Sequence, residues 1–196
     1  MIVGVVLAAG LSRRMGQPKL LLTLEGKPVL RHAVERMLAG GVEEAVIVVP
    51  AEHGDLESAL AGLPVRFAVN PRPEAGQGSS IAAGVSAVPA GAEAMLIVLG
   101  DQPRVPPEVI PGLIVAFRRT GKGIAAPRYR GGQGNPVLFG PQVIPELRGL
   151  SGDRGARSVI EKDGNRVAWV DFDLSMPTDM DTPEDYDRLR SRDEAV

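Results

Sequence analysis

Cysteine is absent from the 196 residues, and histidine occurs only twice, as His32 and His53. Without cysteine the chain has no disulfide scaffold, no thiolate metal site and no cysteine nucleophile. Two histidines argue against a metal centre built from several imidazoles, and we expect both to be structural or solvent-facing. The lack of disulfides fits a cytoplasmic protein, which is the location we expect.

Neither sign of charge is in excess, because 22 Lys and Arg residues are balanced by 24 Asp and Glu residues, leaving a net charge of −2. A dedicated nucleic-acid binder usually carries a strongly basic domain, so we expect no nucleic-acid partner. Aromatic residues make up only 4% of the chain, so platforms for stacking bases are few.

Long hydrophobic runs are also missing. The one segment that resembles a targeting signal, residues 2–11, is about half the ~20 residues that a membrane span needs. Arg13 and Arg14 follow this segment, whereas a signal peptide carries its positive charge before the apolar stretch. We therefore expect no membrane association, and we interpret residues 2–8 as a buried strand.

Glycine and proline are plentiful instead, with 24 and 17 residues, and they divide the chain into short elements. Continuous apolar runs predict buried strands, and helical spacing of apolar residues predicts helices between them. The predicted strands are residues 2–8, 45–49, 65–69 and 95–99, and the predicted helices are residues 28–38, 55–61, 79–88 and 107–119. This alternation is typical of a mostly parallel sheet with helices on both faces.

The pattern changes after the fourth predicted helix. Short extended pieces at residues 123–126, 136–139 and 167–172 lie between glycine-rich loops, helices are expected at residues 154–162 and 182–190, and a frayed polar tail is expected over residues 188–196. A chain of this length forms one domain. We predict a single domain over residues 1–196, an α/β fold built as a three-layer α/β/α sandwich with a Rossmann-like, mostly parallel sheet.

The loop after the first predicted strand, residues 7–19, has a composition suited to phosphate. Ligands bind at the carboxyl ends of strands in open α/β sheets. The small residues 8–10 let the backbone approach a ligand closely, and N–H groups in such a loop can cradle phosphate oxygens. Arg13, Arg14 and Lys19 add cations for a polyphosphate, with Lys19 expected to be a surface group. A solvated basic loop is the alternative, and the position after a buried strand and a glycine turn favours phosphate binding.

Two better-known phosphate motifs do not fit. The Walker pattern fails because Gly16 follows Gly10 at the wrong spacing and Lys19 is not adjacent to it. The dinucleotide pattern G-x-G-x-x-G fails at Gly10, and residues 76–81 begin correctly but end in Ile81. Both a P-loop enzyme and a nicotinamide enzyme are therefore disfavoured.

Carboxylates suited to a divalent cation follow the strand at residues 95–99. Asp101 should emerge at the same sheet edge as the loop at residues 7–19, and Mg²⁺ prefers carboxylate oxygens together with water and substrate phosphates. An Asp-Gln-Pro turn that caps a helix is the alternative. A second carboxylate would come from Asp179 or Asp181, because D-x-D spacing puts both on one face of an extended segment. Asp181 also fits a helix cap.

Two further segments offer groups for anions. Ser79 and Ser80 begin a predicted helix after two glycines, so their free N–H groups suit an anion or a base edge, although an ordinary helix cap explains them nearly as well. Arg154 and Arg157 lie three residues apart, which puts them on one side of a helix where they could meet an acceptor phosphate. Solvent-exposed arginines are the alternative.

The loop at residues 7–19 reads L-A-A-G-x-S-x-R-M-G-x-x-K, which resembles the signature of the MobA-like nucleotidyltransferases. The L-A-A-G form, with alanine where guanylyltransferases carry glycine, is similar to the molybdenum cofactor cytidylyltransferase branch. Residues 99–103 resemble the metal-site motif of the family, and residues 70–80 lie where it recognises the base. Residues 151–157 and 179–185 match its C-terminal motifs, so the resemblance spans nearly the whole chain.

The resemblance implies the nucleotide-diphospho-sugar transferase type of fold and Mg²⁺-dependent transfer of CMP from CTP to the phosphate of molybdopterin, with release of pyrophosphate. The N-terminal half would bind the NTP and the C-terminal half the acceptor, and a molybdoenzyme or an insertion chaperone is a possible partner. The implied residues are Arg14, Lys19 and Asp101 for catalysis; Leu7, Ala8, Ala9, Gly10, Ser12, Arg13, Arg14, Lys19, Asn70, Gln77, Gly78 and Ser79 for the nucleotide; Asp101 and Asp181 for the metal; and Asn135, Arg154 and Arg157 for the acceptor. Many relatives carry histidine where this chain has Asn135.

Three alternatives remain open at this point. The chain could act on another phosphorylated acceptor such as a sugar phosphate, it could use GTP as a molybdopterin guanylyltransferase, or it could be a non-catalytic, nucleotide-binding accessory protein for cofactor insertion. The methyl groups of Ala8 and Ala9 would narrow a base pocket against a purine, which favours CTP. The sequence alone does not decide the base, the acceptor, the oligomeric state or the partner.

Overall fold

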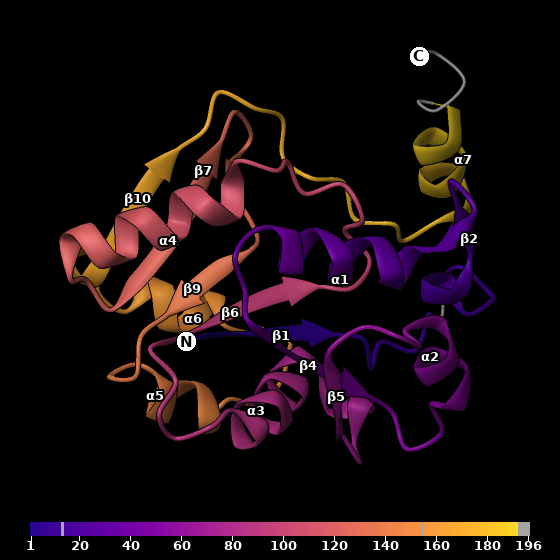
Figure 1. The fold of residues 1–196 in the computed structure, drawn as a ribbon, viewed down its shortest axis with the longest axis horizontal. Helices are drawn as coiled ribbons and strands as arrows, with labels where there is room; N and C mark the ends of the chain where they lie inside the picture. Colours follow the sequence, from indigo (N-terminus) through magenta and orange to yellow (C-terminus); the bar gives the residue numbers. More distant parts are fainter. Residues whose placement is uncertain (13, 154, 192–196) are drawn as a thin grey trace.

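The computed structural model describes residues 1–12, 14–153 and 155–191 (Figure 1). Its central sheet contains the four predicted strands in parallel, with bounds β1 Ile2–Leu7, β4 Glu44–Val49, β5 Val65–Val69 and β6 Ala94–Leu99. They lie in the order β6-β1-β4-β5, so the carboxyl ends of β1 and β6, two neighbouring strands in the middle of the sheet, open on the same edge.

The other half of the sheet contains parallel and antiparallel pairs. Strand β9, Val137–Phe139, runs antiparallel between β6 and β7, Ile124–Tyr129. Strand β10, Val167–Asp171, closes the sheet in parallel with β7, and the short β8, Gly132–Gln133, pairs with β7. The full order is β10-β7-β9-β6-β1-β4-β5.

Two hydrophobic cores cover the two faces of this sheet. In β1 the side chains alternate, so Ile2 and Val6 enter one core while Val3 and Val5 enter the other, and all four are at most 1% exposed. The first core is covered by α1 Val29–Ala39, α2 Gly54–Ala59, α4 Val109–Thr120 and α7 Pro183–Ser191, and the second by α3 Gln77–Ala87, α5 Ile144–Arg148 and α6 Arg157–Glu161 (Figure 1). Burying such side chains contributes about 1.5–3 kcal/mol each, and the arrangement confirms the three-layer α/β/α sandwich.

Several short elements were not predicted. They are the hairpin β2 Thr23–Leu24 and β3 Lys27–Pro28, the 3-10 helices η1 Lys19–Leu21, η2 Pro73–Ala75 and η3 Gly164–Arg166, and the helix α5 and strand β8. The hairpin turns at Glu25 and Gly26, which both have positive φ. Because such pieces contain two to five residues, periodicity cannot reveal them.

Two expectations near the C-terminal end were wrong in part. Helix α6 begins at Arg157 rather than three residues earlier. Helix α7 extends to Ser191, and Leu189 is 4% exposed, so residues 188–191 are not a frayed tail; residues 192–196 lie outside the described part of the chain.

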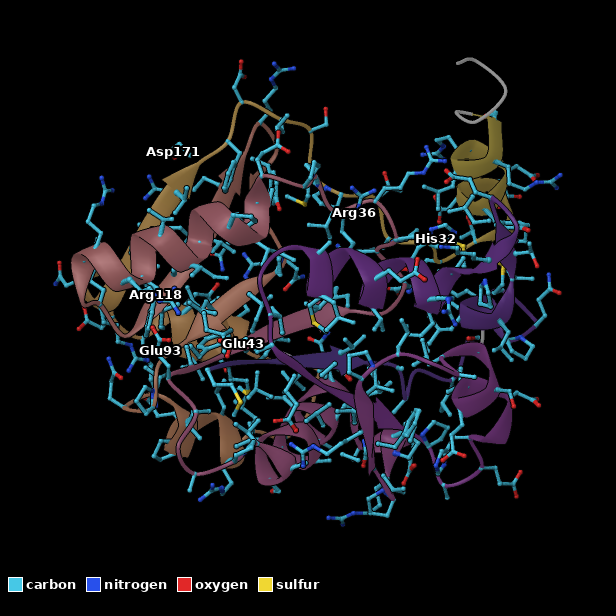
Figure 2. All side chains as sticks on the ribbon, viewed as in Figure 1. His32, Arg36, Glu43, Glu93, Arg118 and Asp171 are labelled. Atoms are coloured by element: carbon cyan, nitrogen blue, oxygen red, sulfur yellow. The ribbon has the colours of Figure 1, made fainter. Side chains whose placement is uncertain are left out.

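Ion pairs connect the residues at the amino ends of neighbouring strands. Figure 2 shows Arg118, at the end of α4, lying beside Glu93 and Glu43. Arg118 donates two hydrogen bonds of 2.7 Å to the carboxylate of Glu93, and the terminal amino group of Met1 lies 3.7 Å from Glu93 and 3.8 Å from Glu43. This cluster lies on the side of the sheet away from the carboxyl ends of β1 and β6.

Within the described residues, the structure contains no helix that combines the length and the apolar character needed to cross a membrane.

Candidate active site

A cavity of about 550 Å³ lies at the carboxyl edge of the sheet. Five segments distant in sequence meet around it: the loop after β1, the end of β6, the start of α3, the loop that contains Asp153 and the segment before α7. Its lining residues are Leu7, Ala9, Gly10, Leu11, Ser12, Arg14, Lys19, Leu20, Pro73, Glu74, Gly76, Gln77, Ser80, Leu99, Asp101, Asp153, Asp179 and Asp181. The size and position are those of a small-molecule site in an α/β fold.

The loop after β1 is held closed by Ser12. Its carbonyl accepts hydrogen bonds from the N–H groups of Met15 at 3.1 Å and Gly16 at 3.2 Å, and its Oγ accepts one from the N–H of Lys19 at 3.3 Å. Ser12 adopts φ of 48°, a left-handed conformation that is uncommon for a residue with a side chain. Met15 is 5% exposed and packs in the core, so the loop returns the chain to the cavity at Lys19.

Lys19 lies between two carboxylates. Its Nζ donates to Oδ2 of Asp101 at 2.5 Å and to Oδ1 of Asp181 at 2.8 Å, and its side chain is 11% exposed. Burial lowers the pKa of Lys19, but the attraction and hydrogen bonds of Asp101 and then Asp181 outweigh it, so the pKa lies above its usual value. The expectation of a surface lysine was wrong, because both carboxylates draw the ammonium inward.

The lining of the cavity carries more negative than positive charge. Arg14 donates to Oδ2 of Asp181 at 2.7 Å, and its side chain is 71% exposed. Of the described lining residues, five are acidic, namely Glu74, Asp101, Asp153, Asp179 and Asp181, and two are basic, namely Arg14 and Lys19. A polyphosphate would therefore need further positive charge to enter. Arg13 and Arg154, which were predicted to supply such charge, lie outside the described residues.

The acidic segment before α7 is attached to the end of β6 through the backbone. The N–H of Met180 donates to the carbonyl of Asp101 at 3.1 Å, and the Met180 side chain is fully buried in the core. Asp181 is thereby brought to the same cavity as Asp101, as predicted. Asp185 caps the start of α7 by accepting from the N–H groups of Asp181 and Thr182 at 3.2 and 3.0 Å, so the Asp181 side chain stays available to the cavity.

Asn70 lies behind the cavity wall rather than in it. The residue is 2% exposed, and its Nδ2 donates to Oγ of Ser79 at 2.9 Å and Oγ of Ser80 at 3.0 Å. Its Oδ1 accepts from the N–H of Arg72 at 3.0 Å. These bonds use both N–H donors of the Asn70 amide and fix the start of α3, which begins at Gln77 rather than at Ser79.

Three other predicted nucleotide residues also lie off this lining. Ala8 faces a separate cavity between the loop and α2, while Ala9 lines the first cavity. Gly78 and Ser79 are in the first turn of α3, next to the lining residues Gln77 and Ser80. The remaining described residues predicted for the nucleotide, namely Leu7, Gly10, Ser12, Arg14, Lys19 and Gln77, line the first cavity with Ala9.

A second cavity, of about 400 Å³, adjoins the first. It contains two of the residues predicted for the acceptor, Asn135 and Arg157, and the carbonyl of Asn135 accepts a hydrogen bond of 2.7 Å from the hydroxyl of Tyr129. Its floor is apolar, formed by Ile81, Ile97, Val137, Phe139 and Ile160, and the two cavities share Leu7, Gln77, Leu99 and Asp153.

The two cavities meet where two glycine-rich segments join. The N–H of Gly78 donates to the carbonyl of Gly152 at 2.9 Å, and the N–H of Gly152 donates to the carbonyl of Ala75 at 3.2 Å. A Cβ on Gly78 would lie 2.7 Å from the backbone nitrogen of Ser151, so only glycine permits this approach. Sequence reasoning missed this contact and the wall residue Asp153. The pattern that could have revealed the contact is the pair of glycine-rich segments, residues 76–78 and 152–155.

Comparison with known sequences gives a consistent result. A model of the MobA-like NTP transferase domain matches residues 4–167. Purine catabolism protein PucB of Bacillus subtilis (strain 168) is 32% identical over 201 residues, and nicotine blue oxidoreductase of Paenarthrobacter nicotinovorans is 35% identical over 198 residues, each alignment covering 96% of both chains. A Pyrococcus horikoshii protein named "probable molybdenum cofactor guanylyltransferase" is 31% identical over 153 residues, 78% of this chain and 74% of that one.

Solved structures agree over nearly the whole chain. The crystal structure of Rv0371c from Mycobacterium tuberculosis H37Rv superposes with a TM-score of 0.85 and 30% identity, covering 97% of each chain. The structure of Rv0371c in complex with manganese superposes with a TM-score of 0.81 and 29% identity, covering 97% of this chain and 98% of that one.

Proposed function

Because this chain belongs to the MobA-like NTP transferase family and is therefore a nucleotidyltransferase, we propose that it transfers CMP from CTP to the terminal phosphate of molybdopterin and releases pyrophosphate. The observation that carries the proposal is the pair of adjoining cavities with Lys19, Asp101 and Asp181 in the first. A transferase needs room for two substrates side by side and charged groups at the transferred phosphate, and both are present.

The donor set fits a divalent cation such as Mg²⁺. Asp101 and Asp181 already share one cation, the ammonium of Lys19, at 2.5 and 2.8 Å. Within the described residues no group of three or more His, Cys, Asp or Glu side chains forms a metal site. The chain would therefore supply these two carboxylates as ligands, and the nucleotide phosphates and water would supply the remaining ligands. When bound, the cation would neutralise and orient the triphosphate. It would also offset the acidic lining of the first cavity.

The reaction needs no covalent protein nucleophile. An oxygen of the acceptor phosphate would form a bond to the α-phosphorus of CTP, and the bond from that phosphorus to the bridging oxygen would break, releasing pyrophosphate with the electron pair. Because the attacking oxygen is already anionic, positioning and charge neutralisation carry the catalysis. Lys19 and Arg14 would turn from the carboxylates to the triphosphate, and N–H groups of the loop at Gly10 would donate to its oxygens.

The choice of CTP rests on the L-A-A-G form of the loop. Ala9 lines the first cavity and is 2% exposed, so its methyl group occupies space that glycine would leave open to a purine. The names of the relatives state different reactions, including guanylyl transfer to a molybdenum cofactor, so the base must be decided by experiment.

The acceptor would lie in the second cavity. Its apolar floor suits a flat ring system, and Gln133, Asn135 and Arg157 offer polar groups at its rim. The wall shared with the first cavity would bring the acceptor phosphate toward the α-phosphorus.

The test is pyrophosphate release from each of CTP, GTP, UTP and ATP with Mg²⁺, in the presence and absence of molybdopterin. We expect release only with the acceptor present and fastest with CTP. Fastest release with GTP would make the chain a guanylyltransferase, and release with sugar phosphates but not with molybdopterin would change the acceptor. A protein that binds CTP and Mg²⁺ but never releases pyrophosphate would be an accessory protein.

The variant Asp101→Asn distinguishes an enzyme from a protein that only binds nucleotide. The substitution keeps the shape of the side chain and removes one negative charge, so the protein should stay folded while turnover falls by about 100-fold or more. Nucleotide without metal should bind at least as tightly as to the wild type, because a carboxylate beside a triphosphate repels it. Pyrophosphate release and nucleotide titration check both results, and full turnover in this variant would remove Asp101 from the mechanism.

A further inference from the structure

Gln102 directly follows the candidate metal carboxylate Asp101 in the chain, and its side chain points into the protein. The residue is 3% exposed, and its Nε2 donates a hydrogen bond of 2.6 Å to Oδ1 of Asp179. Its Oε1 is buried and has no hydrogen-bond partner among the described residues. A buried amide that satisfies only one of its two ends costs stability, so its presence calls for an explanation.

The partner of Gln102 belongs to the D-x-D segment, for which the sequence left two candidate metal ligands. The two aspartates have different neighbours in the structure. Asp181 accepts from Lys19 at 2.8 Å and from Arg14 at 2.7 Å, whereas Asp179 accepts from the neutral amide of Gln102. Met180, between them, is anchored through its N–H to the carbonyl of Asp101 and through its buried side chain to the core.

We propose that Gln102 is a positioning residue: it holds Asp179 away from the cation position and thereby leaves Asp181 as the second carboxylate beside Asp101. This role rests on the proposed function, because it presumes that a metal–nucleotide complex binds at these carboxylates. This role explains why the amide is buried. Its N–H group holds Asp179, and its carbonyl remains without a hydrogen-bond partner among the described residues.

The consequence of losing Gln102 follows from like-charge repulsion. Asp179, Asp101 and Asp181 all line the first cavity. A third carboxylate free to turn toward the other two would repel them and displace them from the arrangement in which they face the cation. Groups that orient metal ligands typically contribute about 10- to 100-fold to metal affinity, so the effect is measurable.

The experiment measures the dissociation constant of Mn²⁺ by electron paramagnetic resonance, with a non-hydrolysable methylene analogue of CTP present. Asp179→Asn and Asp181→Asn make the same chemical change two residues apart. We expect Asp181→Asn to weaken Mn²⁺ binding by about tenfold or more, and Asp179→Asn, which keeps an oxygen for Gln102 to donate to, to stay within about threefold of the wild type. Equal losses in the two variants would overturn the proposal.

A double variant distinguishes positioning from a general contribution to folding. Gln102→Leu should weaken Mn²⁺ binding by about tenfold, and Gln102→Leu combined with Asp179→Asn should restore it, because the neutral amide at position 179 no longer repels the two carboxylates that face the cation. A merely structural Gln102 would not be rescued in this way, and failure of the rescue, or unchanged Mn²⁺ binding in Gln102→Leu, would overturn the role.

The melting temperature of each variant shows whether it is folded. If Gln102→Leu does not fold, the comparison of Asp179→Asn with Asp181→Asn still tests the proposal. Failure of the proposed function looks different: the wild type itself would then bind no Mn²⁺ with the nucleotide analogue, which would overturn both the proposed function and this role. Wild-type binding with unchanged Gln102 variants overturns this role alone.

Discussion

Lys19 combines two tasks that the loop sequence alone does not separate. Its ammonium group lies where it neutralises Asp101 and Asp181, yet the same charge lines the cavity proposed to bind the triphosphate. The two tasks exclude each other at one moment, because one ammonium cannot hold both carboxylates and a phosphate at full strength. We infer that Lys19 releases the carboxylates when a metal–nucleotide complex arrives.

Lys19→Met tests this exchange, because it keeps the length of the side chain and removes the charge. Without nucleotide, Mn²⁺ should bind about tenfold more tightly than to the wild type, since no ammonium competes for the carboxylates. Turnover should fall by about 100-fold, since a charge aimed at the reacting phosphates is lost. Lys27→Met, at an exposed ion pair with Glu35, is the control that should change neither value.

The melting temperature provides a second measurement on the same variant. Asp101 and Asp181 would face each other without the ammonium group between them, so Lys19→Met should melt at a lower temperature than the wild type, and added Mn²⁺ should restore the melting temperature. A variant with unchanged Mn²⁺ affinity and unchanged melting temperature would mean that the contacts of Lys19 with both carboxylates contribute nothing in solution.

At the scale of single elements, the start of α3 depends on a residue outside the helix. Asn70 satisfies the hydroxyls of Ser79 and Ser80 and the N–H of Arg72 at once. The sequence predicts Asn70 as a base-binding residue, and its burial indicates instead that it acts through the helix start, where Gln77 and Ser80 line the first cavity.

Asn70→Ala should therefore lower the free energy of unfolding by about 1–3 kcal/mol, because the buried hydroxyl of Ser80 and the N–H group of Arg72 lose their partner. The KM for nucleotide should rise, while the ratio of CTP to GTP use should stay as in the wild type. Urea denaturation and steady-state kinetics measure the two effects, with the exposed Asn165→Ala as control. A changed base ratio in a variant of unchanged stability would return Asn70 to the base pocket.

Helix α5 is joined to the segment after α6 by an ion-pair cluster. Glu146 accepts hydrogen bonds from Arg166 at 2.5 and 3.3 Å and from Lys162 at 2.9 Å. First the bonds from Arg166 and then the bond from Lys162 hold the pKa of Glu146 at about 2, against its usual 4.5. Because the pKa is lower in the folded state, the cluster stabilises the fold fully above pH 4.5 and loses this contribution as the pH falls toward 2.

Glu146→Gln should lower the free energy of unfolding by about 1–2 kcal/mol at pH 7, less than the full pKa shift implies because the pair is partly screened by solvent. The difference from the wild type should shrink progressively below pH 4.5, where the carboxylate of the unfolded chain becomes protonated. Urea denaturation over a pH series measures this, with the exposed Glu52→Gln as control. Stability differences that are the same at pH 7 and pH 3 would contradict the assignment.

For the whole molecule, local patterns predicted the layers but not the contacts between them. Apolar runs and glycine turns were enough to predict the strands β1, β4, β5 and β6 and a mostly parallel sheet, because such strands are recognisable without any partner. The antiparallel entry of β9 between β6 and β7 depends on which strand ends lie together in space, and three residues carry no pattern that states it.

Some features of the candidate site were likewise predictable from the sequence, and others were not. The loop at residues 7–19 and Asp101 were predictable because they follow strands directly. The contacts of Lys19 join residues 82 and 162 positions apart, and the bond from Gln102 to Asp179 spans 77 positions, so spacing in the sequence gives no indication of them. The burial of Lys19 followed from those distant contacts and was missed for the same reason.

The wall shared by the two cavities has a consequence for what happens after the bond is made. In the proposed reaction a dinucleotide product would occupy both cavities at once, so both of its halves would have to dissociate together, whereas each substrate would leave from one cavity alone. Product departure, rather than the bond-forming step, should then set the pace of the cycle. Rapid mixing should reveal a burst of pyrophosphate close to one per enzyme, followed by a slower steady rate; a rate that is linear from the first turnover would contradict this. If the product is the proposed cofactor, one that dissociates this slowly would stay shielded from water until a receiving protein took it over, which would make the transferase a temporary carrier of its own product.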